Sequence, residues 1–292
     1  RLVPKLIDVN EIVVYSGLND ESIHKTGHNA SVIGQSELKR LSYDHFETLI
    51  NQVPSLNWAG GTSRPRYFQI RGIGERSQYF GEGAPNFSVG FILDDMELSG
   101  LGMLGNLFDL NQIEVFRGPM SSVFGTNSLA GLISLRSNNP GDTLGLESLL
   151  SGGTDNYLSL GTMLNLPINN KLQFRFSGSI LQSDGFRYNK FRESSDSNKK
   201  DEQFIRVKLN YKPLKNFKVL STLIYAELDN GYDSWAPDNN TDFHTYSDDT
   251  GEDSQKTLGG SVRINLNSSN KYKFTSISAY TKTCLLYTSP SP

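Results

Sequence analysis

The sequence lacks the features that define several common classes of protein. Only one of its 292 residues, Cys284, is a cysteine, so no disulfide framework can form within the chain. No apolar run approaches the roughly 18 residues of a membrane-spanning helix, which excludes a helical membrane protein. The net charge is −3 and no segment is strongly basic, so the sequence gives no electrostatic reason to expect nucleic-acid binding. The chain also begins at Arg1 without a starting methionine or signal peptide, which predicts a processed product or a fragment.

Residues that favour strands and turns are abundant instead. The chain has 13 tyrosines, 16 phenylalanines and 27 glycines, and polar and apolar residues alternate along most segments after Pro140. We expect about seven strands of about ten residues, the length with which a tilted strand crosses a bilayer. The predicted strands are Thr143–Gly152, Tyr157–Leu166, Lys171–Ile180, Gln203–Lys212, Phe217–Leu228, Leu258–Leu266 and Lys271–Thr283.

The connections between these strands alternate in length after the first one. Long connections at 184–200 and 229–255 separate short ones at 168–170, 213–216 and 267–270. Outer-membrane barrels alternate in this way because one rim carries tight turns and the other carries extended loops. A soluble antiparallel β-sandwich has the same period of two and is the alternative interpretation.

A barrel also predicts which face of each strand meets lipid. Turning Lys171 and Arg175 outward would cost roughly 2–4 kcal/mol each near the bilayer midplane. We therefore expect the aromatic and aliphatic face outside and the polar face in the lumen.

Glycine-rich stretches and paired polar residues could indicate nucleotide binding, metal binding or catalysis. The positions of these residues in the sequence argue against each of the three. The segment Gly118–Gly125 lacks the lysine and spacing of a phosphate-binding loop, and Arg71–Gly83 does not fit a dinucleotide fingerprint. His24 and His28 have a helical metal spacing, but they lie in a polar linker, so we predict no metal site. Asp94 and Asp95 fall on a predicted strand and should point to opposite faces, which argues against a catalytic dyad. We expect neither an enzyme nor a cofactor.

Several motifs follow one another in a specific order. They are FQIRGIG at Phe68–Gly74, VGFILDDMEL at Val89–Leu98 and the segment Leu107–Ser137, which contains IEVFRGP. Upstream, 35–41 and 46–56 look like two opening helices. This order resembles the plug domain of TonB-dependent outer-membrane receptors, a small globular domain inside a barrel of about 22 strands.

The resemblance implies an α+β plug domain followed by antiparallel β-strands of an incomplete transmembrane β-barrel. We expect a TonB box and linker at 1–28, the plug at 29–140 and the N-terminal part of the barrel at 141–283. Seven strands cannot close around a plug and lipid does not tolerate open edges, so about fifteen strands are expected to be missing. The segment 284–292 breaks the alternation and carries two prolines, and we expect it to be a non-native tail.

Two sets of site residues follow from the resemblance. Arg71 and Arg117, with Glu114 nearby, are expected at the contact between plug and barrel, where barrel glutamates would meet them; the alternative is a solvated surface pair contributing under about 1 kcal/mol. The TonB box is expected at Glu11, Ile12, Val13, Val14 and Tyr15, because a β-branched run can add to a partner's sheet as an edge strand. The alternative for Val13 and Val14 is an ordinary first strand.

Ligand contacts are expected at the plug apices and external loops, where aromatic side chains and cations suit chelates and sugars. The candidates are Arg76, Tyr79, Phe80, Phe87, Phe186, Arg187, Tyr188, Tyr232, Trp235 and His244. Some of the tyrosines fit an aromatic girdle at the membrane interface equally well.

The predicted function is TonB-dependent import of a scarce bulky solute across the bacterial outer membrane. By resemblance, the first candidate for the solute is a ferric siderophore, and cobalamin, haem and oligosaccharides are the alternatives. The expected partners are TonB with its inner-membrane energising complex, outer-membrane lipid and an iron–siderophore chelate, and no nucleic acid. The rival hypothesis is a surface-exposed β-sheet binding or adhesion protein without transport, and an enzyme is a distant third.

Overall fold

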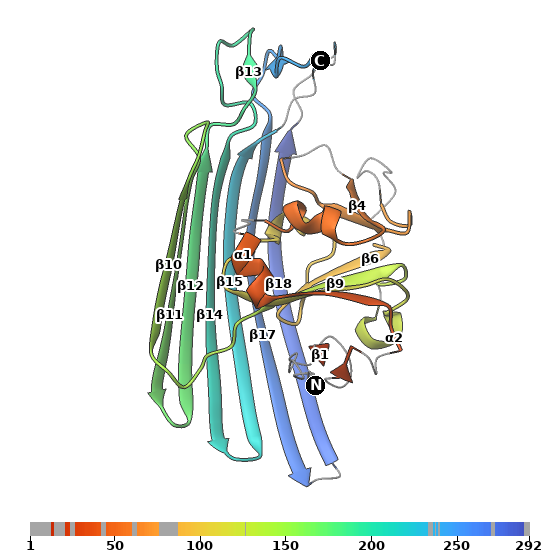
Figure 1. Cartoon of the computed structure of the whole chain (residues 1–292), viewed down its shortest axis with the longest axis vertical. Coiled ribbons are helices and arrows are strands. Elements are labelled where there is room, and N and C mark those ends of the chain that lie inside the picture. The colour runs from red at the N-terminus through yellow and green to blue at the C-terminus, as the bar shows by residue number, and fades with distance from the viewer. Residues whose placement is uncertain are drawn as a thin grey trace, which may run out of the picture.

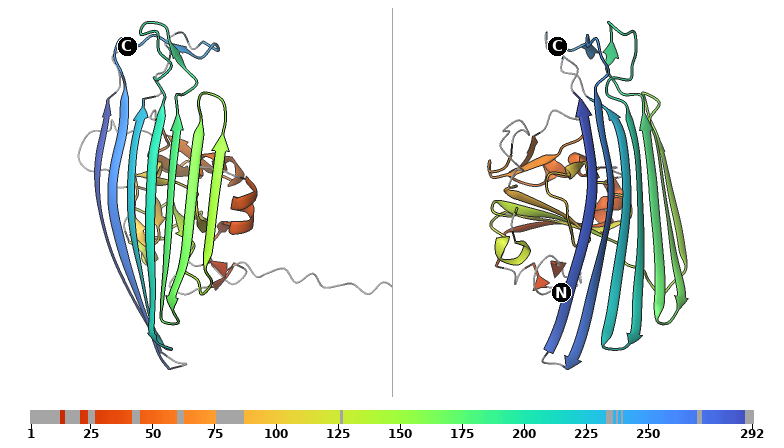
Figure 2. Two further views of the ribbon diagram at one scale, coloured as in Figure 1. Left: turned by 90° about the vertical axis from the view of Figure 1, so that its left-hand side faces the viewer. Right: turned by 180° about the vertical axis from the view of Figure 1, so that it is seen from behind.

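A seven-stranded β-sheet, a five-stranded β-sheet, three two-stranded pairs and a few short helices make up the described part of the chain in the computed structural model (Figure 1). The structure describes residues 13–14, 21–23, 27–41, 45–59, 63–75, 87–125, 127–232, 236, 238, 240–269 and 272–288. One sheet forms a tall wall, and the N-terminal domain packs along one side of it (Figures 1 and 2). No helix in these ranges is long and apolar enough to cross a membrane.

The wall is a seven-stranded antiparallel sheet in sequence order, which confirms the seven predicted strands. Its long strands follow one another because each connection joins neighbours. Six of the seven strands are longer than predicted, since their ladders continue past the segments of clear alternation, and β10 is two residues shorter than predicted. They are β10 (Gly145–Gly152), β11 (Leu158–Asn169), β12 (Leu172–Ser183), β14 (Lys200–Leu214), β15 (Phe217–Gly231), β17 (Glu252–Ser269) and β18 (Tyr272–Thr288).

The two faces of the wall differ as the alternation predicts. Leu160, Ile205, Leu258 and Tyr280 are among the exposed large apolar side chains of the outer face. Polar side chains face the N-terminal domain and are buried, among them Gln173, Ser177, Arg206, Lys208, Asn210 and Thr257. The side chains of a strand alternate between faces, so the sequence alone sets this division.

The two rims of the wall also differ. β11, β14 and β17 end at one rim, where short connections follow them. The long connections lie at the other rim, beside the short turn after β10, and carry β13 (Tyr188–Asn189) and β16 (His244–Thr245), which pair in parallel (Figure 1). The long connections thus join each other above the wall. We call these the short-turn end and the long-loop end.

The last strand differs from the expectation at its end. Residues 284–288 belong to β18, and Cys284 lies opposite Lys256 in the ladder. The backbone pairing therefore does not stop at Thr283, because a strand needs no alternation of side chains to continue its main-chain hydrogen bonds. The non-native origin of 284–292 stays a prediction.

The N-terminal domain is built on a five-stranded sheet of order β3-β8-β9-β6-β7. Its strands are β3 (Ala30–Gly34), β8 (Leu110–Phe116), β9 (Gly131–Ser137), β6 (Val89–Leu93) and β7 (Met96–Glu97). Smaller elements are the pair β1 (Val13–Val14) and β2 (Glu21–Ser22), the pair β4 (Leu56–Ala59) and β5 (Tyr67–Ile70), helices α1 (Gln35–Leu41) and α2 (Ser121–Phe124), and 3₁₀ helices η1 (Phe46–Gln52) and η2 (Gly102–Leu104).

Two of the predicted elements in this domain are shorter than expected. The second opening helix is the 3₁₀ helix η1, which ends at Gln52 because Pro54 disfavours helical geometry in the residue before it. The predicted strand Val89–Leu98 is divided into β6 and β7 by a turn at Asp94 and Asp95, whose φ angles are 46° and 72°. Aspartate tolerates this left-handed region better than most residues.

The hydrophobic core spans both sheets. Phe46, Phe68 and Phe91 form its aromatic centre, with ring centroids of Phe68 and Phe91 5.5 Å apart. Phe204 and Ile224 of the wall belong to the same cluster. The contact between the domain and the wall is therefore partly apolar and not only polar as expected, which adds the burial of apolar area to its stability.

Candidate plug–barrel interface

The first polar contact joins the segment before β5 to the long-loop end of the wall. Arg64 makes a two-pronged pair with Glu202 of β14, with Nε 2.7 Å from Oε1 and Nη2 2.9 Å from Oε2. Arg64 also pairs with Glu47 of η1, and Arg66 pairs with Asp253 of β17. We call this set the long-loop contact. The N-terminal domain supplies its arginines, and the wall supplies Glu202 and Asp253.

Neighbouring polar groups complete the long-loop contact. The backbone N–H and the hydroxyl of Ser63 both donate to Oδ2 of Asp253, at 2.8 and 2.7 Å. Asn230 of β15 donates to Ser63 and to Glu202. Arg66 and Asp253 have side-chain exposures of 1% and 0%. Removing one partner of such a buried pair typically costs about 3–5 kcal/mol, because the other charge is left unpaired.

His45 lies beside this contact and stays neutral. Its Nε2 donates to the carbonyl of Met103 at 3.1 Å, and its Nδ1 accepts from the backbone N–H of Glu47 at 3.2 Å. Burial, reinforced by the charge of Arg64, lowers the pKa of His45 to about 4. Burial opposes the charge of Glu47, but Arg64 outweighs it and lowers the pKa of that carboxyl. The cluster thus holds its carboxylates ionised and its imidazole uncharged.

A second contact lies nearer the short-turn end and has the opposite polarity. Asp94 lies 3.1 Å from Nζ of Lys208 on β14, and Arg263 of β17 donates from Nε to Asp95 at 2.8 Å. Asp109 takes a two-pronged pair from Arg175 of β12. We call this set the short-turn contact. Here the N-terminal domain supplies the carboxylates and the wall supplies the cations.

Asp94 is enclosed by groups of both the N-terminal domain and the wall. It is 9% exposed, and the backbone N–H of Ser137 donates to its Oδ1 at 3.0 Å. Ser261 of β17 donates to its main-chain carbonyl at 2.8 Å. Burial opposes ionisation, but Lys208 and Ser137 outweigh it, and the pKa of Asp94 falls to about 2. The turn between β6 and β7 is thereby fastened to two wall strands.

The three residues predicted at the plug–barrel contact have other surroundings. Arg71 is exposed, and Arg117 donates to the amide oxygen of Asn29 at 2.6 Å within the N-terminal domain. Glu114 is 0% exposed and accepts from Gln112 at 2.7 Å. Their role at the barrel contact stays a prediction. The sequence signal that was missed is the pair of arginines around Pro65 and the aspartates that follow a buried strand.

The predicted TonB box is described only in part. Val13 and Val14 pair antiparallel with Ser22 and Glu21, and Val14 is 3% exposed. The side chain of Gln112 donates to the carbonyl of Val13 at 2.8 Å. Glu11, Ile12 and Tyr15 lie outside the described residues. The valines lie at the end of the domain nearer the short turns (Figure 1).

Some of the predicted ligand residues come together at the long-loop end. Phe186 meets Phe243 edge-on at 5.4 Å, and Tyr188 meets His244 at 6.2 Å, so the two long connections share an aromatic cluster. The guanidinium of Arg187 lies 5.4 Å from the Phe186 ring centroid.

The remaining ligand candidates do not join that cluster. Phe87 stacks on Tyr67 in the N-terminal domain, and the backbone N–H of Tyr232 donates to Gly251. The other four candidates lie outside the described residues, namely Arg76, Tyr79, Phe80 and Trp235.

Comparison with known proteins decides what this arrangement is. Residues 22–132 match the family model of the TonB-dependent Receptor Plug Domain. Residues 22–132 of this chain are therefore a plug domain of this family. The predicted fold class, a plug domain followed by antiparallel strands of an incomplete barrel, is confirmed, as is the predicted placement in the bacterial outer membrane.

Relatives and solved structures agree with this family. The vitamin B12 transporter BtuB of Vibrio vulnificus is 23% identical over 255 residues, covering 82% of this chain and 39% of that protein. The ferrioxamine B receptor of Salmonella typhimurium is 25% identical over 174 residues, covering 55% and 23%. The ferric yersiniabactin uptake receptor FyuA from Yersinia pestis superposes with a TM-score of 0.76 at 17% identity, covering 91% and 42%. The chain thus spans less than half the length of these proteins, which are transport receptors and not enzymes.

Proposed function

We propose that the receptor containing this chain imports a scarce, bulky solute across the outer membrane, with energy supplied through TonB and its inner-membrane complex. The observation that carries the proposal is the plug itself: a folded domain held against the lumen face of the wall through charged contacts of two polarities. Such a domain blocks a pore until force is applied, because its polar contacts can be exchanged for water.

TonB would act on the N-terminal segment. Val13 and Val14 form a two-residue strand, and a short β-branched strand can be transferred to the sheet edge of another protein at small cost. Its position near the short turns supports a partner on the periplasmic side. Force on this segment would reach the five-stranded sheet through Gln112, which holds the carbonyl of Val13.

A ferric siderophore is the solute that best fits the observations. The ferrioxamine B receptor and the ferric yersiniabactin uptake receptor are both named for iron chelates, and the long-loop end gathers aromatic rings and an arginine. Cobalamin is an alternative solute, because one relative is a vitamin B12 transporter. Haem and oligosaccharides are further alternatives, because aromatic rings and an arginine also suit them. The apolar outer face of the wall would meet outer-membrane lipid.

The test separates binding from energised import. Val13→Pro should abolish uptake of radioactive iron from a panel of ferric siderophores by iron-starved cells, because proline removes the N–H needed for strand addition. Binding of the same siderophores to the cells should persist. Val13→Ile, which keeps the β-branched side chain, is the matched control and should transport normally.

Two outcomes would contradict parts of the proposal. Undiminished uptake by the Val13→Pro variant would exclude the role of this segment in energy transfer. Saturable uptake of cobalamin, with no binding of any iron chelate, would reject the siderophore assignment and keep the import function.

A further inference from the structure

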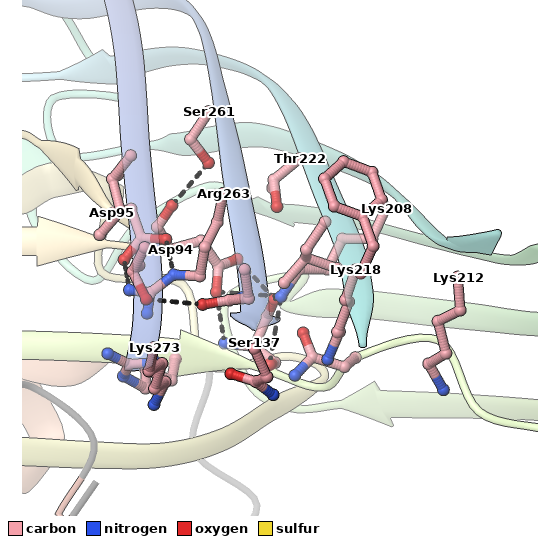
Figure 3. Close-up of a pocket in the computed structure, with 18 of the residues that line it drawn as sticks. Asp94, Asp95, Ser137, Lys208, Lys212, Lys218, Thr222, Ser261, Arg263 and Lys273 are labelled. Carbon is pink, nitrogen blue, oxygen red and sulfur yellow. Dashed lines mark hydrogen bonds and ion pairs between the residues drawn. The ribbon is translucent and has the colours of Figure 1, made fainter. Parts of the chain in front are cut away.

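A cavity of about 1220 Å³ lies between the plug and the wall at the short-turn end. The turn between β6 and β7, helix α2 and the end of β9 form its plug side. The short-turn ends of β12, β14, β15, β17 and β18 form its wall side (Figure 3). Its volume exceeds the roughly 300–1,000 Å³ of typical small-molecule sites, so a drug-sized solute would fit.

Basic side chains dominate the lining of this cavity. Asp94 and Asp95 are already paired with Lys208 and Arg263, which leaves Glu97 as the remaining acidic residue among the described lining residues. The basic residues of the lining are Lys171, Lys208, Lys212, Lys215, Lys218, Lys273, Arg136 and Arg263. The cavity therefore carries a clear excess of positive charge.

The side chains of three of these lysines have no ion pair or hydrogen bond with any residue that the structure describes. Lys171 precedes β12, Lys212 lies near the end of β14, and Lys273 lies at the start of β18. Figure 3 shows Lys212 and Lys273 at opposite ends of the cluster, with Asp94 and Ser137 between them. Cations brought together in a concave surface repel one another and focus a positive potential, which an anion relieves.

Arg206 extends the same charge deeper between plug and wall. It lies on the lumen face of β14, as do Lys208 and Lys212, because residues two apart share a face. It is 2% exposed, and its Nε and Nη1 have no hydrogen-bond acceptor among the described residues. A buried guanidinium with two unsatisfied nitrogens is costly unless an anion or water reaches it.

We propose that this cavity binds multivalent oxyanions, and that it receives the carboxylate or phosphate groups of the imported solute at the short-turn end. The inference rests on the proposed import function and narrows the solute to an anionic class. Binding would weaken with salt, because several of the lysines are in contact with solvent.

The test measures anion binding directly. Complete receptor in detergent would be titrated calorimetrically with pyrophosphate and with citrate at low ionic strength. Replacing Lys171, Lys212 and Lys273 together by glutamine should weaken binding at least about tenfold, because three charges facing the anion are lost. The matched control replaces Lys39, Lys199 and Lys256 by glutamine. It removes the same charge outside the cavity and should change binding less than about twofold.

The outcomes separate this inference from the proposed function. Tighter binding of citrate supports a carboxylate-bearing solute, and tighter binding of pyrophosphate a phosphate-bearing one. Equal affinity in the cavity variant and the unaltered receptor, or no binding of either anion, would overturn the inference even if energised uptake is intact. Anion binding that is lost in the cavity variant, in a receptor without energised uptake, would support the site and reject the import function.

Discussion

The long-loop contact and the short-turn contact between plug and wall have opposite polarity. At the long-loop contact the plug supplies Arg64 and Arg66, and the wall supplies carboxylates. At the short-turn contact the plug supplies Asp94, Asp95 and Asp109, and the wall supplies lysine and arginine. A plug displaced along the wall would bring like charges together, so the reversal fixes the height of the plug more firmly than one set of pairs would.

The two contacts also differ in how far their side chains are exposed to solvent. Arg66 and Asp253 are almost fully buried, whereas the side chains of Asp95 and Arg263 are 17% and 21% exposed. Buried pairs cost most when broken, and solvated pairs cost least. Substitutions in the more buried pairs should therefore lower the stability most.

Arg66→Met should give the largest effect. It leaves Asp253 buried without its cation, and the free energy of plug unfolding should fall by about 3–5 kcal/mol. Urea unfolding of the receptor in detergent measures this loss. The double variant Arg66→Met/Asp253→Leu should recover much of it, since an apolar pair leaves no unpaired charge. A loss under about 1 kcal/mol in the single variant would show that the long-loop contact is solvated.

His45 should make the long-loop contact sensitive to acid. Its pKa is about 4 in the folded plug and 6.5 in the unfolded chain, so the unfolded state binds the extra proton first. Stability is therefore present above pH 6.5 and is lost as the pH falls from about 6.5 to about 4, by about 3 kcal/mol in total.

His45→Gln should flatten this pH dependence while keeping a donor for the Met103 carbonyl. Thermal unfolding at pH 7, 5.5 and 4.5 would compare the variant with the unaltered receptor. A slope unchanged by the substitution would assign the acid sensitivity to other groups.

Asp95→Asn should weaken the short-turn contact by only about 1 kcal/mol, because the pair with Arg263 is partly solvated. Asparagine tolerates the positive φ of this position, so the turn itself should be retained. The urea midpoint reports the change, and the same substitution in an Arg263→Gln background should cost almost nothing further. A full second loss in that background would mean that the two side chains act independently.

Lys39→Ala should give the smallest effect. Lys39 of α1 pairs with Glu147 of β10 at 3.0 Å, with side-chain exposures of 56% and 51%. Exposed pairs of this kind contribute about 0–1 kcal/mol. A loss comparable with that of Arg66→Met would show that exposure does not rank these contacts.

The sequence by itself determined the wall. Alternation of period two predicts each strand and the face it turns away from the plug, and the alternation of connection lengths predicts the two rims. These properties are local, because adjacent side chains of a strand must point to opposite faces. Around the motif of Ile113 and Arg117, β8, α2 and β9 form a strand–turn–helix–strand unit.

Only the tertiary structure decided which charges meet. Arg66 and Asp253 are 187 residues apart, and Lys208 and Asp94 are 114 apart, so no local pattern links them. Their pairing depends on the height and rotation at which the plug packs against the wall, and the shared apolar core around Phe68, Phe91 and Ile224 sets both. Period two tells a strand which side faces the lumen, but a contact needs the position of the opposing surface, which only packing supplies.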